Sequence, residues 1–226
     1  RFPGTSPADW ANGADGLTTN PGSVVTAIPF DADNATNSAD ILAIGRKAWD
    51  RKFKNGKSLA ACFPNVGKRV AASYPQFDAK TRQVVTLEVA INRCLQLHRE
   101  PEIDYANHAL MGPLTAYLRS LSDGQKLAVR IGNTAARDRY DAGKSLYQRR
   151  IGQYDYACAS CHVQHAGGLY GQAGLSPAIG QAANWPRLEP GGKVRTLHMQ
   201  FQACMLRTRA EPFAAGSDEF NNLEYF

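Results

Sequence analysis

An internal repeat constrains the fold of this chain more than any other feature. Tyr74 and Trp185 each precede a proline and open a stretch that reaches a cysteine, Cys94 in the first copy and Cys204 in the second. Apolar residues stand 10, 7 and 3 positions before each cysteine: Val84, Leu87 and Ile91 in the first copy, and Val194, Leu197 and Phe201 in the second. This spacing is typical of one face of an α-helix. The repeat therefore predicts two copies of a small helical unit, each with a cysteine on a core-facing helix.

Two glycines extend the repeat toward the start of each copy. Gly45 is followed four residues later by Trp49, and Gly143 is followed four residues later by Tyr147. A glycine on a helix face lets a second helix approach closely, and a nearby aromatic ring fills the space at the crossing. We therefore expect an all-α fold with one such helix crossing in each copy.

The predicted organisation has three parts. Residues 1–34 are rich in Gly, Pro, Asn, Asp and Thr and have no helical period, which indicates an extended arm. Residues 35–124 form the first unit and residues 125–226 the second. No strand ladder is evident, and the predicted helices cover roughly residues 39–53, 80–97, 106–121, 124–150, 193–207 and 217–226.

A short motif in the second unit predicts a covalently bound haem. The sequence Cys-Ala-Ser-Cys-His occupies residues 158–162. The thiols of Cys158 and Cys161 can add to the two vinyl groups of one porphyrin, and His162 then presents its imidazole to the iron. A redox disulfide would need a βαβ context, and a zinc site would need a second C-x-x-C pair; the sequence offers neither. We therefore expect one haem c in the second unit.

The first unit lacks this motif. Cys62 stands at the equivalent place, but no histidine follows it closely, so we expect the first unit to hold no haem. Cys62 and Cys94 occupy the places of a haem-attaching cysteine and of Cys204. We predict that they form a disulfide in place of the missing cofactor. The alternative, two free buried cysteines, is less favoured in an oxidising compartment.

The second axial ligand of the iron decides the chemistry of the site. Small cytochromes commonly use methionine, and Met205 lies one residue from the apolar stripe. His198 and His165 are weaker candidates. Cys204 holds the position that the repeat defines, and it is the cysteine left over once the motif and the disulfide are counted. The sequence therefore favours Cys204 as the ligand and leaves Met205 open.

A thiolate ligand would have chemical consequences. It would stabilise ferric iron and lower the reduction potential, which suits sulfur chemistry at the ligand better than a simple electron relay. Cations close in sequence could donate hydrogen bonds to an oxyanion; these are Lys193, Arg195, Arg207 and Arg209. For any one of them, the alternative is a solvated charge at a helix end.

Charge and composition limit the partners and the compartment. The net charge is +6, but Lys and Arg form no dense tract, so a small anion or an acidic protein is a better partner than nucleic acid. Covalent haem and a disulfide both favour an exported protein. No apolar run long enough to span a membrane is present. The chain begins at Arg1 with no charged-then-apolar leader, so we expect either a processed form or a protein that never had one.

These features together resemble the SoxA family, the catalytic subunits of the bacterial thiosulfate-oxidising SoxAX cytochromes c. The resemblance is carried by the haem motif, by Phe-Gln-Ala-Cys-Met at residues 201–205, by Arg-Ala-Glu-Pro-Phe at residues 209–213, and by a haemless first unit with Cys62 and Cys94. It covers nearly the whole chain from about residue 35.

The resemblance implies two tandem cytochrome c-like helical domains and a periplasmic location. It implies His162 and Cys204 as iron ligands, with the cysteine often carrying an extra sulfur in this family. It also implies a SoxX-like cytochrome c partner and the oxidative joining of thiosulfate to a cysteine of a SoxYZ-like carrier protein. An arginine accompanies the ligand cysteine in the family, and Arg207, Arg209 or a more distant arginine is left for that role here.

Two other functions stay open on the sequence. One is a periplasmic electron-transfer cytochrome that uses Met205 as the second ligand. The other is a thiosulfate dehydrogenase, which would couple two thiosulfates to tetrathionate without a carrier protein.

Overall fold

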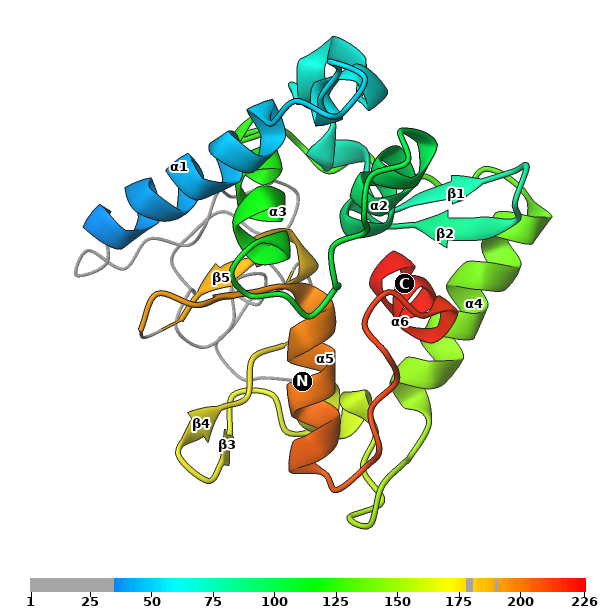
Figure 1. Cartoon of the computed structure of the whole chain (residues 1–226). Helices are drawn as coiled ribbons and strands as arrows, with labels where there is room; N and C mark the ends of the chain where they lie inside the picture. Colours follow the sequence, from blue (N-terminus) through cyan, green and yellow to red (C-terminus); the bar gives the residue numbers. More distant parts are fainter. Residues whose placement is uncertain (1–34, 178–180, 190) are drawn as a thin grey trace.

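The computed structural model of the chain describes residues 35–177, 181–189 and 191–226 (Figure 1). The predicted arm over residues 1–34 lies outside them. The helices are α1 (Ala35–Asp50), α2 (Leu87–Leu97), α3 (Met111–Ser120), α4 (Thr134–Gln148), α5 (Leu197–Arg207) and α6 (Asp218–Tyr225). Helices dominate the described residues, which confirms the expected fold class. None of these helices is long and apolar enough to cross a membrane.

Three short antiparallel hairpins, which the sequence did not predict, interrupt the helices. They are β1–β2 (Gln76–Asp78 and Gln83–Val85), β3–β4 (Leu169–Tyr170 and Ala173–Gly174), and β5–β6 (Arg187–Leu188 and Val194–Arg195). The first and third hairpins occupy equivalent places in the two copies of the repeat. Because of them, the predicted helices over 80–97 and 193–207 begin later than expected. Val84 and Val194 lie in strands and not on the helical stripe.

Each late helix start has a capping residue. The side chain of Thr86 accepts a hydrogen bond from the amide of Val89 at 3.3 Å, and the side chain of Thr196 accepts one from the amide of Met199 at 3.4 Å. A threonine in this position satisfies an amide that the first helical turn leaves unpaired. The predicted helix over 124–150 likewise begins only at Thr134, because Asn133 caps it.

Helices α2 and α5 are equivalent elements of the repeat, and each is 11 residues long. Two residues past the end of each helix stands an arginine in the left-handed region, Arg99 at φ 57° and Arg209 at φ 54°. The amide after each arginine then donates to a carbonyl oxygen of the last helical turn, from Glu100 after α2 and from Ala210 after α5. The two copies therefore share their caps as well as their apolar faces.

The predicted glycine crossings are present in both copies (Figure 1). A Cβ atom on Gly45 would lie 2.1 Å from the carbonyl oxygen of Pro113, so α1 meets α3 backbone to backbone. A Cβ atom on Gly143 would lie 1.9 Å from the carbonyl oxygen of Asn222, where α4 meets α6. Neither site has room for a larger residue, which confirms the close approach that the sequence predicts.

The two copies also pack against each other. Helix α6 of the second unit lies beside β2 of the first, and α3 of the first unit lies beside β6 of the second (Figure 1). The Nδ1 atom of His108 lies 2.9 Å from the carbonyl oxygen of Val194, across this contact. The strand just before the cysteine-bearing helix α5 thus contacts the first unit, and Met205 near the end of α5 packs in the core of the second unit.

Candidate haem site

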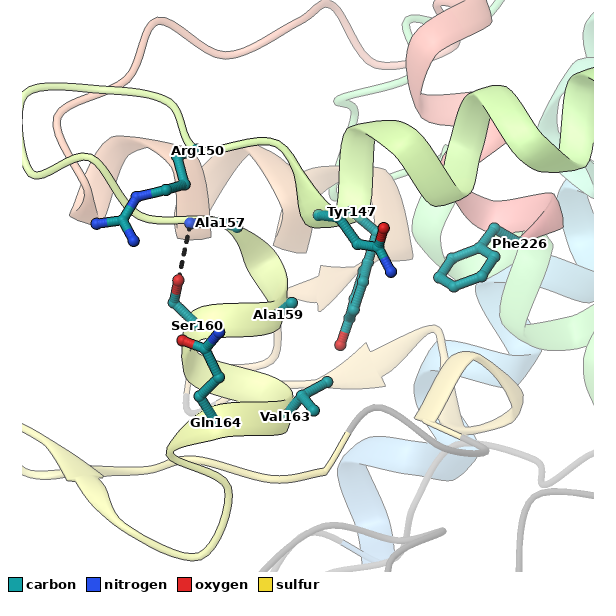
Figure 2. Close-up of a pocket in the computed structure, with 9 residues that line it drawn as sticks. Tyr147, Arg150, Ala157, Ala159, Ser160, Val163, Gln164 and Phe226 are labelled. Atoms are coloured by element: carbon teal, nitrogen blue, oxygen red, sulfur yellow. Dashed lines mark hydrogen bonds between the residues drawn. The ribbon is translucent and has the colours of Figure 1, made fainter.

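The C-x-x-C-H motif forms a short helical segment with a π-helical part over Ser160–Gln164. Ser160 closes the start of the segment, because its Oγ atom accepts a hydrogen bond from the amide of Ala157 at 3.1 Å (Figure 2). Single π-helical turns occur frequently at functional sites. The motif residues therefore sit on a locally fixed backbone.

His162 has the orientation of a metal ligand. Its Nδ1 atom lies 2.6 Å from the carbonyl oxygen of Ser176. A carbonyl oxygen can only accept, so Nδ1 carries the proton and donates it. In the neutral ring Nε2 is then the nitrogen with a lone pair, which is the atom that can bind iron, and the hydrogen bond fixes the ring. Sequence reasoning missed Ser176, because no spacing rule links it to the motif.

Three cysteines form no disulfide and are partly buried: Cys158, Cys161 and Cys204. Burial raises the pKa of Cys158 to about 11, and the nearby charge of Cys204 adds to this. Burial also raises the pKa of Cys204, with a further contribution from Cys161. Because the charge of Cys204 acts on the thiol of Cys158 and that of Cys161 acts on Cys204, α5 lies close to the motif. Two attachment thiols, a free imidazole nitrogen and a third sulfur are a donor set that fits a haem c.

A cavity of about 490 Å³ lies on the other side of the motif (Figure 2). Tyr147 and Phe226 form one wall, and Ala159, Ser160, Val163 and Gln164 form the other. The two attachment cysteines and His162 do not line it. The cavity nevertheless lies close to the motif: burial raises the pKa of Tyr147 in its wall, and the charges of Cys158 and Cys161 add to this effect.

The predicted cations lie at different places around Cys204. The charge of Arg207 opposes the effect of burial and lowers the pKa of the Cys204 thiol, as does the charge of Arg195 to a smaller extent. The guanidinium of Arg209 instead stacks over the ring of Tyr154, 5.0 Å from its centroid. The structure thus brings Arg207 and Arg195 into the electrostatic surroundings of the sulfur and turns Arg209 toward a neighbouring loop.

The competing ligands are engaged elsewhere. Met205 is buried in a core with Leu146, Ala210, Phe220 and Leu223. His198 accepts a hydrogen bond from the amide of Gly216 through Nδ1, and its Nε2 atom lies 3.2 Å from a carboxylate oxygen of Glu224. Both side chains are occupied within the second unit. The sulfur of Cys204 forms no disulfide.

Gln200, which lies beside Cys204, was not predicted from the sequence. The Nε2 atom of Gln200 lies 3.3 Å from the sulfur of Cys204, one helical turn away on α5. The i, i+4 spacing of the two residues is the signal that could have revealed this contact.

The first unit holds a disulfide where the second unit has Cys204. Cys62 and Cys94 are bonded, with their Cα atoms 5.8 Å apart. Cys94 belongs to the buried core of that unit, together with Leu59 and Ile91, and the partly buried Cys62 packs against this core. The bond therefore ties α2 to the turn that occupies the place of the haem motif.

Comparison with known proteins gives concordant matches. A family model described as the SoxA/TsdA cytochrome c domain matches residues 44–127, most of the unit that lacks the haem motif. The L-cysteine S-thiosulfotransferase subunit SoxA of Chlorobaculum tepidum is 38% identical over 183 residues, which are 80% of this chain and 63% of that protein. The protein of the same name from Allochromatium vinosum is 33% identical and is matched over 100% of this chain and 79% of its own length.

A solved structure matches the fold. The crystal structure of SoxXA from P. pantotrophus contains a chain with a TM-score of 0.75 and 24% identity, covering 92% of this chain and 89% of that chain. At this identity, the match concerns the fold alone. The present chain spans about 63% of the length of the Chlorobaculum relative.

Proposed function

The chain belongs to the SoxA family of cytochromes c, and from this premise we propose that it is an L-cysteine S-thiosulfotransferase subunit. Such an enzyme is a haem-dependent oxidoreductase that joins thiosulfate to a cysteine of a SoxYZ-like carrier protein. One observation carries the proposal: Cys204 forms no disulfide, and its charge acts on the thiol of Cys158 in the haem motif, so an unbonded sulfur lies close to the motif. A simple electron relay has no use for a reactive sulfur at that place.

A member of this cytochrome c family carries covalently bound haem c. We propose that there is one, attached to Cys158 and Cys161, with His162 and Cys204 on the iron. The free Nε2 atom of His162 supports this assignment. When bound, the haem would supply an acceptor for single electrons next to the Cys204 sulfur.

The proposed reaction is a two-electron oxidation. The carrier thiol and thiosulfate form a new S–S bond, giving a cysteine S-thiosulfonate, one proton and two electrons. The electrons would leave one at a time for a SoxX-like partner cytochrome. Cys204 would contact the reacting sulfur atoms. Arg207, whose charge acts on this sulfur, would attract the thiosulfate dianion and balance its charge as the carrier arrives, and Arg209, which stacks on Tyr154 just beyond α5, would add positive charge farther from the sulfur.

The proposed function also has consequences for the compartment and for the domain boundaries. We propose that the protein works in the periplasm, because covalent haem attachment and the Cys62–Cys94 disulfide suit an oxidising compartment. We propose that residues 35–124 and 125–226 are its two domains and that the first domain binds no haem.

Replacement of Cys204 tests the proposed function. We expect Cys204→Met to keep the fold and the covalent haem, while the transfer of thiosulfate to a purified carrier protein falls below detection. Intact mass of the carrier after incubation measures this transfer directly. Conjugation at the wild-type rate by the variant would contradict the proposal. Tetrathionate formation without any carrier would instead assign a thiosulfate dehydrogenase.

A further inference from the structure

We propose that Gln200 is a positioning residue for the Cys204 sulfur, held in one orientation by the ion pair of Arg195 and Glu189. This inference deepens the proposed function and depends on it, because it concerns the same sulfur. It assigns a role to a side chain that neither the haem motif nor the predicted cations include.

Three consecutive contacts form a relay that ends at the sulfur. The carboxylate of Glu189 lies 2.7 Å from Nη2 of Arg195. The Nη1 atom of Arg195 donates to Oε1 of Gln200 at 2.9 Å. The Nε2 atom of Gln200 then lies 3.3 Å from Sγ of Cys204. We call these four residues the sulfur relay.

The chemistry of the groups fixes the direction of the last contact. A guanidinium has only donors, so the atom of Gln200 that meets Arg195 must be the amide oxygen. The NH₂ group of the same amide must then face Cys204, whose sulfur can only accept from it. This argument settles the orientation of the amide, which distances alone leave ambiguous.

The β5–β6 hairpin holds the relay in place. Arg195 lies in β6 opposite Arg187, and Glu189 follows β5 directly, two residues after Arg187, so Glu189 and Arg195 are diagonal neighbours on the hairpin. The amide of Glu189 donates to the carbonyl oxygen of Lys193 at 2.8 Å, which closes the turn. The side chains of Arg195 and Glu189 are 23% and 27% exposed, so solvent screens this pair less than a fully exposed one.

The repeat supplies an internal comparison. Gln200 is four residues before Cys204 on α5, and Ala90 is four residues before Cys94 on the equivalent helix α2. Cys94 is tied up in the disulfide, and Ala90 only packs against the core of that unit. A side chain that donates to sulfur therefore occurs in the copy whose cysteine is free and is absent from the copy whose cysteine is bonded.

The expected effect of the relay is electronic. An N–H donor draws charge from a sulfur ligand, which weakens the donation of that sulfur to iron and raises the reduction potential of the haem. Gln200 would therefore orient the sulfur and moderate its bond to the metal.

The test uses the purified haem-loaded protein and a redox titration followed by the visible spectrum. In Gln200→Leu we expect the ratio of reduced to oxidised haem at a fixed solution potential to fall about tenfold, which is about 59 mV for one electron. Gln200→Glu keeps the size of the side chain and the contact with Arg195 but removes the donor, so the ratio should fall in the same direction. Arg195→Met should give a smaller fall, because the amide would then be free to turn.

Gln202→Leu is the matched control. Gln202 lies on the same helix, but its Nε2 atom donates to the carbonyl oxygen of Phe213 at 3.1 Å and not to the sulfur. Its replacement should leave the potential unchanged. A purely structural role for Gln200 would lower the melting temperature without moving the potential, and that result would overturn the inference.

The Cys204→Met variant distinguishes a failure of the sulfur relay from a failure of the proposed function. If it changes the haem spectrum while the potentials of both Gln200 variants match wild type, the relay is wrong and the proposed function stands. If Cys204→Met leaves the haem spectrum unchanged, the sulfur is not a ligand, and both proposals fail together.

Discussion

At the scale of single residues, the sequence was most informative about the roles of the cysteines. The offsets of Cys94 and Cys204 within the repeat marked two equivalent positions with different partners, and the structure bonds Cys94 to Cys62 while leaving Cys204 free. The residues that orient the functional side chains were harder to predict from the sequence. Ser176 orients His162 from a loop 14 residues away, and no sequence pattern announces a contact with a backbone carbonyl.

The disulfide gives a prediction at this scale. Cys62→Ser should reduce the free energy of unfolding by about 2–4 kcal/mol, because the unfolded chain loses a covalent constraint. The haem spectrum should stay the same, since the bond lies in the core of the other unit. Chemical denaturation followed by far-UV circular dichroism measures the first effect, and absorption spectroscopy measures the second. A shifted haem spectrum would mean that the disulfide supports the haem site directly.

At the scale of secondary structure, the presence of the helices was predicted better than the residues at which they begin. The apolar spacing that marks the faces of α2 and α5 continues upstream through Val84 and Val194, although both residues lie in strands. Strands of two or three residues are too short to show an alternation of their own, so they were absorbed into the helical pattern. The glycine crossings were predictable because a glycine and an aromatic residue recur at the same spacing.

The α4–α6 crossing gives a prediction for an element. In Gly143→Ala the new methyl group would meet the backbone of Asn222, so the two helices must separate. We expect a loss of about 1–3 kcal/mol of unfolding free energy, as for other overpacked sites. Gly132→Ala is the control, because a Cβ atom there has no neighbour within 4 Å. Equal stability of the two variants in denaturant titrations would show that the crossing relaxes without cost.

At the scale of the whole molecule, the repeat revealed two units but not how they meet. The contact of each unit with a hairpin strand of the other depends on their relative placement, which no local pattern encodes. Charged groups are buried at this contact: Glu88 from α2, Arg119 from α3, His198 from α5 and Glu224 from α6. One carboxylate oxygen of Glu88 has no hydrogen-bond partner.

Glu88 should make the stability of the whole molecule depend on pH. Burial raises its pKa above the ordinary value near 4.5, the charge of Glu224 raises it further, and His198 and Arg119 oppose this only in part. The folded state therefore binds this proton more tightly than the unfolded state does. Its stabilising contribution is complete below about pH 4.5 and is lost as the pH rises through the higher pKa of the folded state.

Glu88→Gln tests this dependence, because glutamine resembles the protonated acid at every pH. The variant should match wild type at acidic pH and become the more stable protein toward neutral pH, by about 1.4 kcal/mol for each unit by which the pKa is raised. Denaturant unfolding of both proteins across that range measures the difference. A difference that does not change with pH would mean that the pKa of Glu88 is the same in the folded and unfolded states. The charges of Arg119 and His198 would then offset the effects of burial and of Glu224 at the contact between the two units.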